Sequence, residues 1–140
     1  MTPQQLKKAL VAAGFEVFRT LGEDVVLADR VRENLIMDSG VRLKAGSPFT
    51  LKVVLRAQRA DFPSEEEAEL FARVRGSADH VLSKGFAEIT ATATKVTDPA
   101  DAERTLDTFY EVTFAKDVAD LDTALAELKV AMGIDKAVRR

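Results

Sequence analysis

The sequence predicts an α+β protein: a single, mostly antiparallel sheet with three helices, in the order α-β-β-β-β-α-β-β-α. Apolar residues recur with a period of two along several segments, which is typical of strands that bury one face. Three other segments place apolar residues three or four positions apart behind capping residues, which is typical of amphipathic helices. Because 140 residues is the usual size of one domain, we expect residues 1–140 to form a single α+β domain.

The first helix is predicted at the start of the chain. Thr2 can accept a hydrogen bond as N-cap, Pro3 suits the first helical position, and Gln5 stands where a capping box has its amide. Gly14 follows as a stop signal. The apolar stripe between them consists of Leu6, Ala9, Leu10 and Ala13.

Strands are predicted from residue 15 to residue 58. Residues 15–27 read as a short hairpin around 22–24, and residues 25–48 hold an additional strand between several breaks. The strongest pattern covers residues 49–57, where the apolar positions are Phe49, Leu51, Val53, Leu55 and Ala57. Mostly polar residues alternate with them, so we expect this strand to be covered by helices on one face only.

The second half of the chain predicts a helix, two strands and a last helix. Ser64 and Glu67 have capping-box spacing, and Lys84 with Gly85 ends a helix over 64–84. Strands follow over 86–97 and 106–115, joined by an exposed loop over 98–105. The last helix covers 118–132, with either Asp117 or Asp120 as its cap.

Composition excludes several kinds of chemistry and partner. The chain has no cysteine, so disulfides, zinc-thiolate sites and thiol nucleophiles are excluded. A formal charge of -3 gives no general attraction for phosphate backbones or anionic lipid, so we expect neither a nucleic-acid nor a membrane partner. The N-terminus lacks the apolar run of a signal peptide, and we expect a cytoplasmic protein.

No catalytic, cofactor or metal site is predicted. His80 is the only histidine, and we expect it to lie at the surface of its helix. Two acidic groups, residues 65–67 and 117–122, stand at helix starts, where the helix dipole favours carboxylates without any cation. The glycines form no phosphate-binding loop, and no serine lies in a Gly-x-Ser-x-Gly turn.

Two sets of residues are candidates for binding a partner. Thr90, Thr92 and Thr94 form a polar stripe on one strand, which is either a solvent-facing sheet surface or a platform for docking. A second set has the parity opposite to the main apolar positions of its strands and would form an apolar patch if gathered on one face; its members are Phe18, Val26, Ile36, Val54 and Phe109. The partner-binding residues we select are Phe18, Val54, Thr90, Thr92, Thr94 and Phe109.

The element order resembles that of the class I type III secretion chaperones and related chaperone-like bacterial proteins. The resemblance rests on the strand 49–57, the helix 64–84, the strand pair 86–97 and 106–115, and the helix 118–132. It implies a homodimer that binds an extended partner segment on exposed sheet and helix surfaces. The additional strand in 25–48 and the length of the 98–105 loop depart from the pattern, and no residue-level role is carried over.

Two hypotheses for function follow. The first is a non-enzymatic protein-binding module, a dimeric chaperone or adaptor that binds an extended segment. The alternative is a small-molecule-binding or enzymatic α+β domain with a pocket between sheet and helices, using carboxylates, arginine and Tyr110. A deep pocket with converging polar groups would favour the alternative, and an open docking surface the first.

Overall fold

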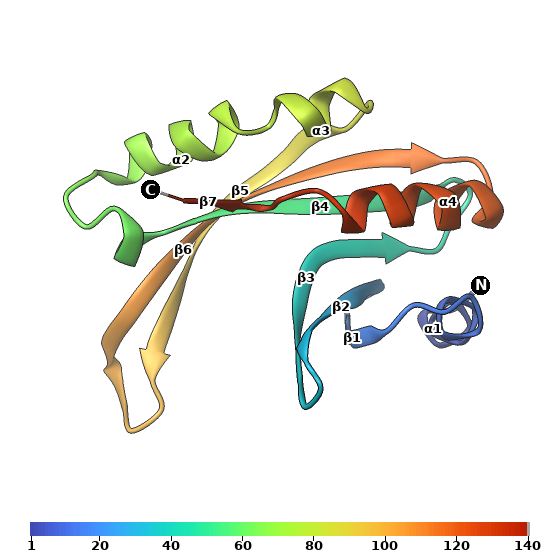
Figure 1. Cartoon of the computed structure of the whole chain (residues 1–140), viewed down its shortest axis with the longest axis horizontal. Coiled ribbons are helices and arrows are strands. Elements are labelled where there is room, and N and C mark those ends of the chain that lie inside the picture. Colours follow the sequence, from blue (N-terminus) through green and yellow to red (C-terminus); the bar gives the residue numbers. More distant parts are fainter. Residues whose placement is uncertain (140) are drawn as a thin grey trace. The chain divides into compact units, whose positions relative to one another are not determined.

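The computed structural model describes residues 1–139 (Figure 1). The elements are α1 (Pro3–Ala12), β1 (Val17–Leu21), β2 (Asp24–Arg32), β3 (Leu35–Lys44), β4 (Phe49–Gln58), a short 3-10 turn η1 (Arg59–Asp61), α2 (Glu67–Gly76), α3 (Asp79–Ser83), β5 (Ala87–Asp98), β6 (Asp101–Val118), α4 (Leu121–Met132) and β7 (Ala137–Val138). None of the helices within the described residues has both the length and the apolar character needed to cross a membrane.

The strands form one sheet in the order β1-β2-β3-β4-β6-β5, and β7 pairs with β4 off this path. β1 to β4 pair antiparallel, whereas β7 runs parallel to β4. This confirms the predicted α+β class with a mostly antiparallel sheet. The region 25–48, which the sequence resolved poorly, supplies most of β2 and all of β3.

The helix count differs from the prediction because the helix expected over 64–84 is divided into α2 and α3. The Ser77 hydroxyl donates to the carbonyl of Val74 at 2.7 Å. Such a local side-chain bond offers the backbone carbonyl an alternative to the next helical bond. The predicted capping box is also displaced, since α2 begins at Glu67 and the Glu66 N–H donates to Glu69 Oε1 at 3.3 Å.

Two other boundaries are decided by the structure. The predicted loop over 98–105 is wrong in conformation, because β5 ends at Asp98 and β6 begins at Asp101 after a two-residue turn. Of the two candidate caps for the last helix, Asp120 is the one used, and its Oδ1 accepts from the Thr123 N–H at 2.8 Å. This bond holds the pKa of the Asp120 carboxyl below its usual value.

The chain divides into two compact units, which share the strands β4 and β6. The first comprises Met1–Val53 with Ala115–Ile134, and the second comprises Val54–Phe114 with the segment that starts at Asp135. In the first unit α1 packs on β1 and β2 and α4 packs on β3. The second unit contains α2, α3, β5, most of β6 and β7.

The apolar parity predicted for β4 is confirmed, since Leu51, Val53 and Leu55 are buried. The expectation that one face stays open is wrong at two places. In β2 the four consecutive residues from Val25 to Ala28 are buried, and a register shift within this stretch breaks the alternation of a regular strand. In β4 Val54 is buried as well, so both faces of the strand are covered there.

Candidate partner-binding strand

The edge strand β5 is the most exposed regular element of the second unit. β5 has twelve residues and stands at the end of the strand order, where β6 is its neighbour among the described strands. Every residue from Ala87 to Lys95 is exposed, so neither face of this stretch is covered. The hairpin of β5 and β6 extends away from α2 and α3 (Figure 1). An edge strand presents its outer row of backbone N–H and C=O groups for pairing with another strand.

The two faces of β5 carry mostly threonine and alanine side chains. Thr90, Thr92 and Thr94 share one face of the strand, as the sequence predicted. The opposite face carries Ala87, Ile89, Ala91 and Ala93, and it is exposed too; Ile89 retains 51% of its surface. Alanine contributes little apolar area, so this face gains little from being covered by a helix. The alanine content is a sequence signal that could have indicated an uncovered strand.

Proline is absent and charged residues are few between Ala87 and Thr97 of β5. Proteins blunt edges with proline, closely spaced charges, bulges or short strands. Between Ala87 and Thr97 there is no proline, and Glu88 and Lys95 are the only charged residues. The other edge strand, β1, has only five residues, and a register shift between Val17 and Arg19 interrupts its pairing with β2. β5 is therefore the better template for a further strand.

One ion pair and one side-chain hydrogen bond link β5 to other elements of its own unit. Arg75 at the end of α2 donates from Nε and Nη2 to the two carboxylate oxygens of Glu88, at 2.9 and 3.0 Å. This hydrogen-bonded pair lowers the pKa of Glu88 below its usual value. Further along the strand, the Thr94 hydroxyl donates to Glu111 Oε1 on β6 at 3.0 Å. The strand is thus positioned before any partner arrives.

Glu111, the hydrogen-bond partner of Thr94, belongs to a cluster on β4 and β6 with Arg56 and Phe109. Glu111 Oε2 accepts from Arg56 Nη2 at 3.3 Å, and the Arg56 guanidinium lies 4.6 Å from the centroid of the Phe109 ring. Arg56 Nε is buried and has no hydrogen-bond partner among the described residues. Phe109, a predicted partner-binding residue, is therefore half-buried, and its ring packs against the Arg56 guanidinium. Neither arginine, Arg56 or Arg75, was selected from the sequence.

The remaining predicted site residues lie elsewhere. Val54 is buried at 4% exposure, so its prediction as a surface contact is wrong. It shares a sheet face with Arg56 two residues away, and the long aliphatic part of arginine can cover such a neighbour. Phe18 belongs to the other unit, is half-buried, and has the Arg19 guanidinium 5.7 Å from its ring centroid.

The predicted apolar patch of opposite-parity residues does not exist as an exposed surface. Val26 is fully buried, like Val54, and Ile36 is half-buried. The prediction assumed that one face of each strand stays open. It is wrong because β2 is buried on both faces at Val26. Of the predicted partner-binding residues, those of the threonine stripe on β5 are exposed.

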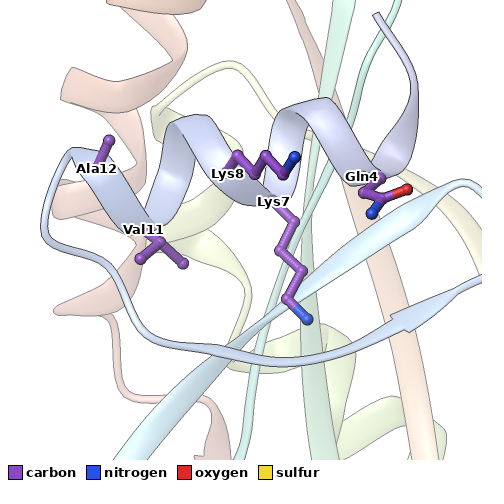
Figure 2. Close-up of a pocket in the computed structure, with 5 residues that line it drawn as sticks. All are labelled: Gln4, Lys7, Lys8, Val11 and Ala12. Carbon is purple, nitrogen blue, oxygen red and sulfur yellow. The ribbon is translucent and has the colours of Figure 1, made fainter.

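A hollow of about 400 Å³ lies on α1 (Figure 2). It is lined by Gln4, Lys7, Lys8, Val11 and Ala12, all from this one helix. Among residues 1–139 no second element lines it, so the hollow is open and its walls are the exposed face of α1 (Figure 2). A ligand there would stay largely in contact with water, unlike a ligand in an enclosed pocket.

The described part of the chain shows no cluster of metal-binding side chains. Residues 1–139 contain no cluster of three His, Asp or Glu side chains that could hold a metal ion. His80 is exposed on α3, as predicted. Tyr110 is buried and its hydroxyl accepts from Arg59 Nη2 at 2.8 Å. Arg59 also donates to the carbonyls of Phe62 and Glu65, so the pair fixes the chain ahead of α2.

Comparison with protein-family models, curated proteins and solved structures finds no match for this chain. The resemblance to type III secretion chaperones therefore remains an expectation from the order of elements. What the molecule itself offers is β5, a long edge strand exposed on both faces.

Proposed function

We propose that this protein is a non-enzymatic protein-binding module whose edge strand β5 pairs with an extended segment of another chain. The observation that carries the proposal is the exposure of β5 from Ala87 to Lys95 at the end of the sheet. In this mode of recognition, backbone hydrogen bonds supply affinity and alternate side chains supply specificity. The Arg75–Glu88 pair favours it, because a strand held in place loses less conformational freedom on binding.

The two faces of β5 define the segment that fits. One face is a threonine stripe, and cross-strand threonine pairs stabilise a sheet. The other consists of small apolar residues beside Ile89, which suits aliphatic side chains of a partner. The fitting segment therefore alternates polar and aliphatic residues and contains no proline at its bonded positions.

The β5 of a second copy meets this description, and we propose a homodimer as the form of the free protein. A two-fold axis at Thr92, perpendicular to the sheet, would pair the strands antiparallel with Thr90 opposite Thr94 of the partner chain. Glu88 would face Val96 and Lys95 would face Ile89, so no like charges stand directly opposite. A chaperone or adaptor would exchange this self-pairing for a segment of its client.

The test compares wild type with Thr92→Lys, which places two lysines opposite each other at the proposed axis. Thr20→Lys on the other edge strand is the matched control, since Thr20 is also an exposed strand threonine. We expect sedimentation at micromolar concentration to show a dimer for wild type and Thr20→Lys and a monomer for Thr92→Lys. In affinity capture from native lysate, we expect wild type and Thr20→Lys to retain proteins that Thr92→Lys does not retain. A monomeric wild type that captures the same proteins as Thr92→Lys would refute the proposal.

A further inference from the structure

The last strand, β7, occupies a backbone position beside β4. The pairing of β3 with β4 ends at Val53, and β7 pairs with β4 at Arg56 and Ala57. The Arg56 N–H donates to the carbonyl of Lys136 at 2.9 Å. Val54 and Ala57 are buried, so the backbone groups of this stretch need hydrogen-bond partners from protein. This position must therefore be filled by an extended segment.

β7 fills it with a short and weakly held strand. It has only two residues, of which Ala137 is exposed and Val138 is half-buried. The ion pair of Arg139 with Asp135 leaves the two side chains 70% and 67% exposed, and pairs this exposed add little stability. Segments with few buried apolar groups open at low free energy without global unfolding. We therefore expect β7 to leave β4 without global unfolding of its unit.

The side chains at this position define a better occupant than β7. Ala137 pairs with Arg56, and Val138 pairs with Ala57 on the apolar parity of β4. The buried Nε of Arg56 has no acceptor among the described residues, and alanine at the paired position cannot supply one. A carboxylate there would accept from Nε in a charge-assisted hydrogen bond, which is about twice as strong as a neutral one.

We propose that this position beside β4 is a second strand-binding site. Its partner is an extended segment that runs parallel to β4 and carries an acidic residue opposite Arg56 followed by a branched aliphatic residue opposite Ala57. β7 is its exchangeable occupant, which satisfies the backbone of β4 until such a segment displaces it. The inference goes beyond the proposed function and is independent of it, because it concerns the backbone of β4 rather than that of β5.

The experiment uses the full-length chain and three labelled six-residue peptides. One peptide has the sequence of residues 134–139. The second has Asp in place of Ala137, and the third has Lys at that position. Each is titrated by fluorescence anisotropy into wild type and into Val138→Pro, which removes an N–H from the β7 ladder. Arg139→Ala, which breaks only the exposed ion pair, is the matched control.

We expect the Asp peptide to bind Val138→Pro about tenfold more tightly than wild type, because the competing strand is weakened. Arg139→Ala should resemble wild type, and the Lys peptide should bind weakest throughout. The proposal is overturned if the Asp peptide binds neither protein, or if the Lys peptide binds as well as the Asp peptide. A dimer formed by exchanged tails would assign the position to a second copy and also overturn it.

Hydrogen exchange of wild type provides a test that does not depend on a variant. We expect the amides of Arg56 and Val138 to exchange through local opening, faster than the amides of Val112 and Phe114 in the buried part of β6. If Arg56 and Val138 exchange only with global unfolding, β7 is a fixed part of the core, and the exchangeable role fails.

Discussion

Replacement of Tyr110 by phenylalanine removes one hydroxyl from the contact that fixes the start of α2. Tyr110 is 5% exposed, and its hydroxyl accepts from Arg59 Nη2 at 2.8 Å. The ring remains in Tyr110→Phe, so its edge-to-face contact with Phe71, at 5.4 Å between centroids, is retained. The change therefore tests one hydrogen bond to a charged donor.

The expected loss follows from the surroundings of Arg59. Hydrogen bonds to charged groups contribute about 1.5–3 kcal/mol to stability. Arg59 keeps the carbonyls of Phe62 and Glu65 as acceptors, so we expect the lower part of this range, about 1.5–2 kcal/mol. For a chain of this size that corresponds to a fall in Tm of roughly 3–8 °C.

Urea denaturation of Tyr110→Phe, Arg59→Gln and the double variant measures the loss and its origin. If the bond is responsible, the two single losses are not additive, and the coupling free energy is about 1 kcal/mol or more. A loss below about 0.5 kcal/mol for Tyr110→Phe, or additive effects, would refute the role assigned to this pair.

Further predictions concern caps, pH, turns and metals. Asp120→Ala should lower the free energy of unfolding by about 1 kcal/mol, measured by urea denaturation, because it removes the N-cap of α4. Asp122→Ala should lower it by less than half as much. The bond from Arg75 lowers the folded-state pKa of Glu88 below 4.5, so its stabilisation is present above pH 4.5 and lost as pH falls through the folded value. Glu88→Gln should accordingly flatten the dependence of Tm on pH below 4.5, and an unchanged profile would count against the pair. Gly22 has a φ of +61° with open space where a Cβ would stand. Gly22→Ala should therefore lower the free energy of unfolding by about 1 kcal/mol, measured by urea denaturation, through backbone strain alone, and Gly22→Asn should lower it less. EDTA should leave Tm unchanged; a fall of several degrees would reveal a bound cation.

Local patterns in the sequence were sufficient for the elements whose determinants lie within a few residues. The capping box of α1 is formed by Thr2 and Gln5 as predicted, since both partners lie in the first turn of the helix. The parity of β4 is right for Leu51, Val53 and Leu55 because alternation along one strand reports which face is apolar. The stripe of Thr90, Thr92 and Thr94 was found for the same reason.

What lies beside each strand was decided only by the tertiary structure. Alternation does not reveal whether the second face is covered, which is why Val54 was predicted at the surface and is buried. The place of β5 at the sheet edge follows from pairing between strands, and this turns its threonine stripe into a candidate docking site. The two residues of β7 carry no detectable periodicity; they form a strand because Arg56, some eighty positions earlier, needs an acceptor for its backbone N–H. Such long-range pairings are not encoded in any short window of sequence, since each depends on residues that only folding brings together.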